Sequence, residues 1–209
     1  MRKPSPNKVL SGRKRFVLGV TGSFGSGKTT VAGIFKSFGA QIIDADKLAR
    51  KSIIPGSQAY KRIIRAFGKD ILSKNKAIDR RKLAGAVFNN KKLLKRLNSI
   101  IHPGVIRVIK NRIRDSRSKA VVLDAPLLIE SGLEALVDKI VVVKISRAKQ
   151  IKRLRKKTGL SRVDILRRIK SQIPQSAKLR LADFIIDNSG TIGETRRQAE
   201  RIRRMLWKN

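Results

Sequence analysis

A phosphate-binding loop is the feature of this sequence with the most definite chemistry. Gly22-Ser23-Phe24-Gly25-Ser26-Gly27-Lys28-Thr29 fits the spacing G-x-x-x-x-G-K-[ST], in which backbone N–H groups and a helix N-terminus surround a phosphate group. In this pattern the lysine reaches the β- and γ-phosphates and the threonine hydroxyl binds Mg²⁺. The glycine loop of dinucleotide-binding proteins is the nearest alternative, but it has no use for Lys28-Thr29 after its last glycine. We therefore predict a nucleotide site that contains Lys28 and Thr29.

Carboxylates follow two short apolar runs that have the character of buried strands. Asp44 ends the run 40–44 and Asp46 follows two residues later, and at this spacing on an extended chain their side chains would point the same way. A carboxylate at this edge of an α/β sheet can accept the proton of an attacking alcohol or hold Mg²⁺ through water. Asp46 could instead cap a helix that begins at Lys47. Asp124 ends the second run and is either a Mg²⁺ ligand of the Walker B type or a strand-end partner of a nearby Lys or Arg.

Cations are also needed at a transferred phosphate, and one predicted helix supplies them. Its basic residues are Lys152, Arg153, Arg155, Lys156 and Lys157. They occupy about one and a half helical turns and point in different directions, so they cannot all reach one ligand. Because phosphoryl transfer needs a cation over the γ-phosphate, one or two of them are candidates for catalysis and the others for solvated surface. His102 is the single histidine and precedes a proline, which is more typical of a structural than of a catalytic histidine.

The elements that must position these residues alternate between strand and helix, which indicates an α/β fold. We expect a five-stranded parallel sheet with helices on both faces, its strands spanning 16–21, 40–44, 120–124, 139–145 and 182–187. Thr191-x-x-Glu194 has the pattern of a capping box and should open a final helix.

Two helical insertions interrupt this sheet. Residues 47–117 contain no convincing strand and should form helical pieces, separated at Pro55-Gly56, Phe67-Gly68 and His102-Pro103. Residues 147–176 should form two basic helices split at Thr158-Gly159, the second opened by Ser161-x-x-Asp164.

The charge of the chain is extreme. Its 209 residues include 51 Lys and Arg against 14 Asp and Glu, which gives a formal net charge of +37 and a pI near 11.8. Such a surface attracts nucleic acids and other polyanions non-specifically, whether or not this binding is its function. An aromatic content of 4% leaves few platforms for base stacking. Residues 1–15, with six basic residues and no acid, are expected to be a disordered tail.

Composition also limits the compartment. The chain has no cysteine, which excludes disulfides and thiolate metal sites. No run approaches the roughly 18 to 20 apolar residues that span a bilayer, and the basic N-terminus lacks the apolar segment of a secretory signal. We expect a cytoplasmic protein without a membrane partner.

In their order along the chain, these motifs resemble the dephospho-coenzyme A kinase family, which phosphorylates the ribose 3′-hydroxyl of dephospho-CoA. The resemblance runs from Leu18 to about Gly190 and rests on Thr21–Thr30, Ile43–Arg50, Pro55-Gly56, Phe67-Gly68, Asp79-Arg80, His102-Pro103, Pro126–Glu130, Gln150–Arg153, Gln172, Lys178 and Ala182–Asn188. The Asp-Ala-Asp, His-Pro, Pro-Leu-Leu-x-Glu and Ile-Asp-Asn elements are far more specific than the phosphate-binding loop.

The resemblance implies ATP and Mg²⁺ as cofactors and dephospho-CoA as the substrate. Asp46 matches the family's proposed base at the 3′-hydroxyl, and Arg153 matches the lid arginine that meets the transferring phosphate. The nucleotide would contact Gly22, Gly25, Ser26, Gly27, Lys28, Thr29, Thr30 and, near the adenine loop, Asn188. Asp44, Arg50 and His102 are expected on the substrate side, and Thr29 and Asp124 are the candidate metal ligands.

The same resemblance divides the chain into parts with separate roles. The nucleotide-binding core would comprise 16–46, 118–143 and 176–209. Residues 47–117 would be the helical CoA-binding insertion, and 144–175 the helical lid.

The sequence departs from the family at three positions. A second lid arginine falls on Lys157, which loses bidentate phosphate geometry, and Arg155 could compensate for it. Ser23-Phe24 stands where the family usually has Gly-Ile, so a bulky ring enters the loop. An acid at Asp124 is not required by the family pattern.

Two other functions fit part of the sequence. Another P-loop small-molecule or nucleoside monophosphate kinase would share the sheet and lid but lack the Asp-Ala-Asp and His-Pro elements. A nucleic-acid-associated or ribosome-associated P-loop NTPase would account for the charge, and it would show RNA-dependent hydrolysis with a steep salt dependence.

Overall fold

The structure is a computed structural model that describes residues 15–88 and 90–207. The basic tail predicted for 1–15 lies outside the described residues except for Arg15. The chain divides into two compact units, one of which ends at Asp44 and resumes at Arg112 while the other is Ala45–Asn111.

A parallel sheet forms the centre of the first unit. Within the described residues it has five strands in the order β2-β3-β1-β4-β5, namely β1 (Phe16–Thr21), β2 (Gln41–Asp44), β3 (Ala120–Asp124), β4 (Lys139–Lys144) and β5 (Phe184–Asp187). All five predicted strands are present. β1 and β3 are unbroken apolar runs and are buried along almost their whole length, as expected for strands covered on both faces.

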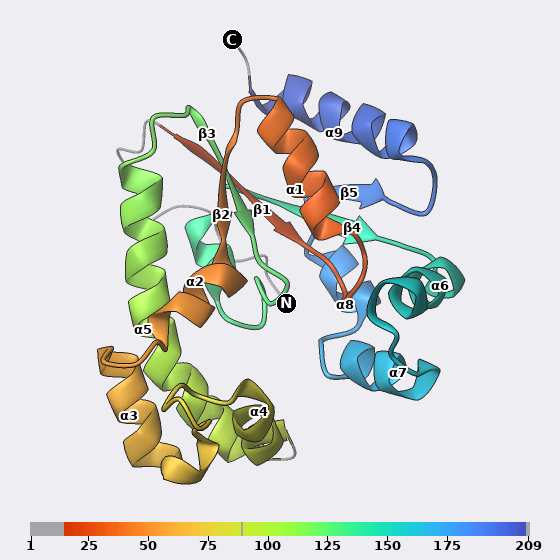
Figure 1. Cartoon of the computed structure of the whole chain (residues 1–209). Coiled ribbons are helices and arrows are strands. Elements are labelled where there is room, and N and C mark those ends of the chain that lie inside the picture. The colour runs from red at the N-terminus through yellow and green to blue at the C-terminus, as the bar shows by residue number, and fades with distance from the viewer. Residues whose placement is uncertain (1–14, 89, 208–209) are drawn as a thin grey trace. The chain divides into compact units, whose positions relative to one another are not determined.

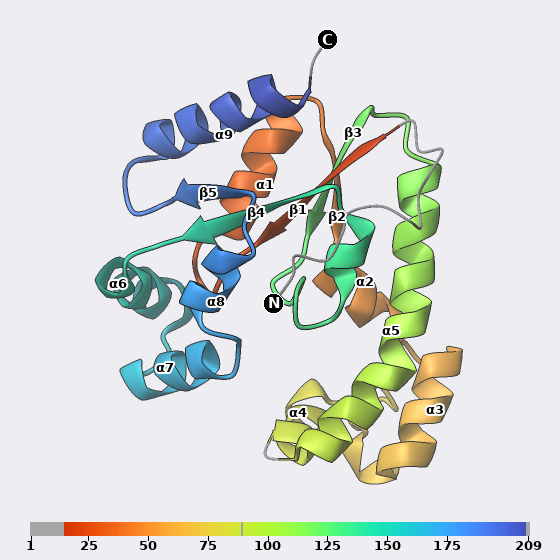
Figure 2. The same cartoon turned by 180° about the vertical axis from the view of Figure 1, so that it is seen from behind.

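Helices cover both faces of this sheet, which confirms the predicted fold class. α1 (Lys28–Ser37) and α9 (Ile192–Leu206) pack side by side on one face (Figure 1). Their buried side chains join the strands in the main core, among them Val31, Phe35, Ala199 and Ile202. The opposite face carries the short helices η2 (Leu133–Leu136) and α8 (Gln175–Arg180) (Figure 2).

The predicted basic helical pair is present as α6 (Arg147–Thr158) and α7 (Arg162–Lys170), beyond the carboxyl end of β4 (Figure 1). The second helix ends earlier than predicted. Because Pro174 disfavours helical geometry in the residue before it, the chain turns after Lys170 and starts the separate helix α8 at Gln175.

The predicted capping residues do cap their helices. The Ser161 side chain accepts from the Asp164 amide at 3.1 Å. Thr191 and Glu194 form a complete capping box, in which the Thr191 amide donates to the Glu194 carboxylate at 2.7 Å. This hydrogen bond holds the pKa of Glu194 below its usual value.

The second unit is helical and has its own small core. It contains α2 (Ala45–Ser52), α3 (Gln58–Phe67), η1 (Lys69–Ile71), α4 (Arg80–Phe88) and most of α5 (Lys91–Arg114). Its buried cluster includes Ile63, Ile71, Leu83, Val87 and Leu97. An isolated bridge between Leu72 and Ile78 interrupts the helices.

The predicted helix break at His102-Pro103 was wrong, because α5 continues through Pro103. Proline removes one helical hydrogen bond, whereas Leu97, Val105 and Ile109 are buried on both sides of it. Burial of these side chains offsets the lost bond. The breaks at Pro55-Gly56 and at Phe67-Gly68 are present.

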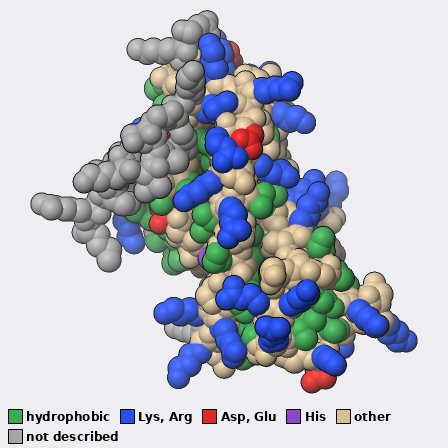
Figure 3. Space-filling view, turned by 90° about the vertical axis from the view of Figure 1, so that its left-hand side faces the viewer, with side chains coloured by type: hydrophobic (Ala, Val, Ile, Leu, Met, Phe, Trp, Pro, Cys, Tyr) green, Lys and Arg blue, Asp and Glu red, His purple; other side chains and the backbone are tan. Residues whose placement is uncertain are grey.

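The basic residues are distributed widely. Lys and Arg side chains are spread over the face visible in Figure 3, with few acidic side chains between them. None of the described helices is both long and apolar enough to cross a membrane.

Candidate active site

The phosphate-binding loop joins β1 to α1, as predicted. Gly27 is the N-cap of α1 with φ 90°, and a Cβ atom there would lie 2.0 Å from Asn188 Nδ2. This position therefore requires glycine for two reasons. Lys28 is 9% exposed, and its Nζ donates to the Ser23 carbonyl at 3.4 Å, so the ammonium group folds back over the loop.

Ser26 gives the clearest indication that the loop is shaped for a ligand. Its side chain is fully buried, and its Oγ has no hydrogen-bond partner among the described residues. Buried hydroxyl groups are nearly always satisfied in native proteins. A phosphate oxygen at this helix N-terminus would satisfy it, so the loop fits a nucleotide phosphate.

Asn188, predicted to lie near the adenine, supports the loop from outside. Its Nδ2 donates to the Ser26 carbonyl at 2.8 Å, and its Oδ1 accepts from Thr195 Oγ1 at 3.0 Å. The side chain thus connects the loop to α9, and it is 5% exposed. Contact with adenine stays a prediction.

Asp44 and Asp124 occupy equivalent positions at the carboxyl edge of the sheet. They are the last residues of β2 and β3 and are paired in register, and Asp124 is also paired with Val20 of β1. Adjacent strands lie roughly 4.8 Å apart, so the sheet brings these two carboxylates together beside the end of β1.

The premise that Asp44 and Asp46 lie on an extended chain was wrong, because Ala45 already begins α2. Asp46 is not an N-cap either. It lies within the first turn of α2, where the helix dipole favours a carboxylate. Arg50 follows one turn later in the same helix.

His102 lies in α5 and is half-buried. Burial lowers the pKa of its imidazole below the ordinary value of 6.5. The ring is therefore neutral at pH 7 and suits hydrogen bonding better than ion pairing.

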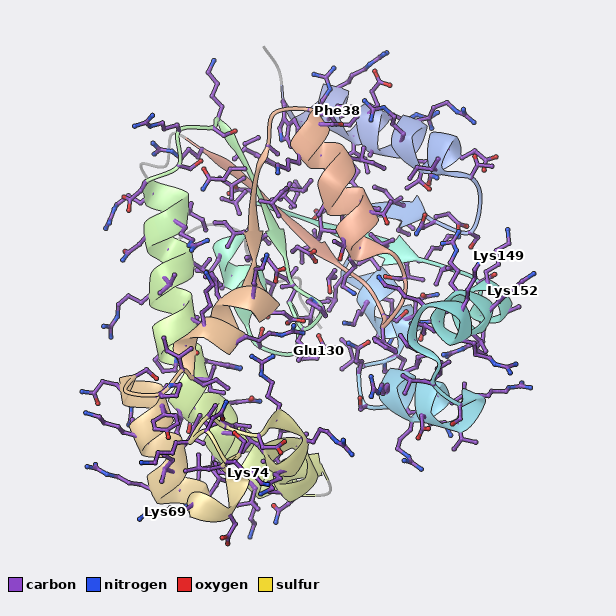
Figure 4. All side chains as sticks on the ribbon, viewed as in Figure 1. Phe38, Lys69, Lys74, Glu130, Lys149 and Lys152 are labelled. Carbon is purple, nitrogen blue, oxygen red and sulfur yellow. The ribbon has the colours of Figure 1, made fainter. Side chains whose placement is uncertain are left out.

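Arg153 lies on α6 and is held by the loop that follows β5. Its guanidinium donates to the carbonyls of Asn188 at 2.9 Å and Gly190 at 3.5 Å. Lys149 donates to the Ser189 carbonyl of the same loop, whereas Lys152 points outward from the helix (Figure 4). Arg155 and Lys157 are exposed in its last turn, and both remain candidates for a second lid cation.

A buried ion pair between Lys178 and Glu130 lies near the ends of β1 and β3, and the sequence patterns indicated no role for it. Lys178 is fully buried in α8 and donates to the Pro126 carbonyl at 2.6 Å and to Glu130 at 2.9 Å. The same Pro126 carbonyl accepts from Thr21 Oγ1 at 3.2 Å. Lys178 therefore joins α8 to the segments after β1 and β3. Its place among the resembling motifs was the available signal.

Removing Lys178 should destabilise the protein strongly. Lys178→Met leaves the Glu130 carboxylate, only 18% exposed, without its cation, and we expect a loss of about 3–5 kcal/mol in the free energy of unfolding. Urea denaturation measures this loss. Lys139→Met is the matched control, because its pair with Asp183 is partly exposed on both sides and should contribute less than about 1 kcal/mol. Equal losses of unfolding free energy in the two variants would contradict the conclusion that the buried pair of Lys178 with Glu130 stabilises the fold.

The strand–loop–helix with Lys28, the sheet order and the basic helical pair define a P-loop kinase. The family model for dephospho-CoA kinase matches residues 16–194. A dephospho-CoA kinase from Carboxydothermus hydrogenoformans is 44% identical over 92% of this chain and 96% of its own length. The chain therefore belongs to the dephospho-CoA kinase family.

Solved structures agree with this assignment. TT1252 from Thermus thermophilus has a TM-score of 0.84 at 29% identity, over 93% of this chain and 99% of its own. A dephospho-CoA kinase from Campylobacter jejuni has a TM-score of 0.58 at 30% identity, over 92% of this chain and 98% of its own.

Proposed function

We propose that this protein transfers the γ-phosphate of ATP to the ribose 3′-hydroxyl of dephospho-CoA, which gives coenzyme A. The observation that carries the proposal is the family match over residues 16–194, which includes the loop with Lys28. The buried and unsatisfied Ser26 hydroxyl supports a phosphate ligand in the loop.

The roles at the phosphates follow from the position of each group. Gly22 and the residues from Gly25 to Thr30 would surround the phosphates with backbone N–H groups, and Lys28 would neutralise charge on the γ-phosphate. Mg²⁺ in such sites uses one or two carboxylates, a hydroxyl and substrate phosphates. The Thr29 hydroxyl and the Asp124 carboxylate fit this set, and a bound Mg²⁺ would neutralise phosphate charge during transfer.

Asp46 is our choice for the base that takes the proton of the 3′-hydroxyl, because it occupies the family's position for this role. Asp44, Arg50 and His102 would contact dephospho-CoA. A neutral His102 can do so by hydrogen bonding, since burial lowers its pKa. The helical unit that carries His102 would then be the CoA-binding insertion, and α6 with α7 the lid.

One assay tests this function. Mg-ATP and the purified protein should convert dephospho-CoA to coenzyme A, detected by mass, with kcat/KM at least about 10²-fold above that for any nucleoside monophosphate. Preference for a nucleoside monophosphate would transfer the protein to the alternative class of nucleotide kinases. Activity that requires RNA would favour the nucleic-acid-associated alternative.

Arg153 should act mainly in the transition state. When the lid closes, its guanidinium would exchange the carbonyls of Asn188 and Gly190 for the transferring phosphate. We therefore expect Arg153→Ala to lower kcat by roughly 10²–10³-fold while KM for ATP rises far less. Steady-state kinetics measure both. Lys152→Ala is the control, since this outward-pointing neighbour (Figure 4) should be silent. An effect confined to KM would make Arg153 a ground-state binder and redirect attention to Arg155 or Lys157.

A further inference from the structure

Phe24 is a side chain of the phosphate-binding loop that the proposed chemistry does not use. Its ring packs outside the main core. The ring belongs to a separate apolar cluster whose buried members are Leu154 on α6 and Ile165 and Ile169 on α7. Arg168 lies over the ring, with its Cζ 5.7 Å from the centroid, within the range of a cation–π contact.

The backbone of Phe24 is also bound by the lid-side segment. Its amide donates to Gln172 Oε1 at 2.7 Å, and its carbonyl accepts from Gln150 Nε2 at 2.6 Å. Gln150 also donates to Ser23 Oγ at 3.0 Å and is 2% exposed. Ser23 and Phe24 are therefore committed to contacts with α6 and with the segment after α7, and Gly22 and the residues from Gly25 onward are left for phosphates.

Helix α6 lies directly against the loop at the next residue as well. A Cβ atom on Gly25 would lie 2.6 Å from the Leu154 side chain. Leu154 adjoins Arg153, whose guanidinium binds the Asn188 carbonyl, and the Asn188 side chain returns to the Ser26 carbonyl. The loop and α6 thus contact one another directly at Phe24 and Gly25 and indirectly through Asn188.

We propose that Phe24 is a positioning residue that couples the phosphate-binding loop to the lid. Its ring and backbone hold α6 and α7 on the first half of the loop, so the helix that carries Arg153 follows the shape the loop takes when phosphates bind. Packed interfaces have discrete arrangements and transmit small shifts. The proposal deepens the proposed function and rests on it for the role of Arg153, but the coupling itself needs only a nucleotide.

The chain offers a matched control for a Phe24 variant. Phe38, the C-cap of α1, is also a partly buried ring under arginines, with Arg196 at 5.0 Å and Arg203 at 5.6 Å. It lies at the end of α1 away from α6 (Figure 4). Phe24→Ala and Phe38→Ala therefore make the same chemical change in the same unit, and only the first touches the lid cluster.

The test compares hydrogen exchange of residues 147–170 with and without saturating ADP, together with ADP affinity by calorimetry and steady-state kinetics. In the natural protein and in Phe38→Ala, we expect ADP to slow exchange across α6 and α7. In Phe24→Ala this protection should be lost, with kcat down by roughly 10–100-fold and the ADP dissociation constant changed by less than about three-fold. Phe24→Ile, which keeps a large apolar side chain in the cluster, should restore protection and most of kcat.

Gln172→Ala keeps the test decisive if Phe24→Ala does not fold. It removes the acceptor of the Phe24 amide while leaving the ring in its cluster, and we expect partial loss of protection. Natural-like protection in both variants, or no protection by ADP in the natural protein, would overturn the coupling. Loss of kcat in Phe38→Ala equal to that in Phe24→Ala would do the same. Exchange and affinity do not depend on dephospho-CoA, so they report on the coupling even if that substrate is wrong.

Discussion

Lys28→Ala should abolish phosphoryl transfer while the protein stays folded. Lys28 is the first residue of α1, and its Nζ lies 3.4 Å from the Ser23 carbonyl, which places the ammonium over the loop that would hold the phosphates. Charge on the γ-phosphate and its bridging oxygen develops during transfer, and an oriented cation in a shielded site stabilises that charge. We expect kcat/KM to fall by at least about 10³-fold.

The fold should tolerate this change. Alanine is the best helix former, so the substitution should leave α1 intact. Lys36→Ala is the matched control, because Lys36 is exposed in the last turn of the same helix. Circular dichroism and urea denaturation should show both variants folded. Transfer by Lys28→Ala near the natural rate would disprove the nucleotide site.

The strands of the sheet could be predicted because their signal is local. β1 and β3 are continuous apolar runs, so burial on both faces follows from composition alone. The start of β5 was predicted two residues too early, because the strand begins at Phe184. Asp183 precedes the strand and makes polar contacts. Its carboxylate accepts from the Ile140 amide at 2.9 Å and pairs with Lys139. This is an interaction with a distant segment that the local pattern does not contain.

The contacts that support the candidate site could not be predicted for the same reason. Lys178 lies in a densely basic stretch and would pass for a solvated residue, yet it is fully buried against Glu130, 48 positions away. Gln172 binds the Phe24 amide across 148 positions. Both contacts depend on how the strands order themselves in the sheet, and spacing along the chain does not encode that order.

The spacing of Asp44 and Asp46 in the sequence also led to a wrong expectation for their backbone conformation. This affects which of the two carboxylates is chosen as the base. Asp44 ends the strand in register with Asp124, whereas Asp46 lies in the first turn of α2. The two carboxylates therefore occupy different kinds of backbone. Asp44 lies beside Asp124 at the sheet edge, and Asp46 stays our candidate for the proton acceptor because of its position in the family pattern.

Asp46→Asn should accordingly lower kcat by roughly 10²–10⁴-fold, because it keeps the size of the side chain and removes the group that accepts the 3′-hydroxyl proton. This variant should fold, because asparagine keeps the size of the side chain and its capacity for hydrogen bonding. Asp44→Asn is the matched comparison and should lower kcat less. Steady-state kinetics with Mg-ATP and dephospho-CoA measure the ranking, and urea denaturation checks that both variants are folded. If Asp44→Asn proves the more damaging of the two, the base is Asp44 and the role carried over from the family to Asp46 is wrong.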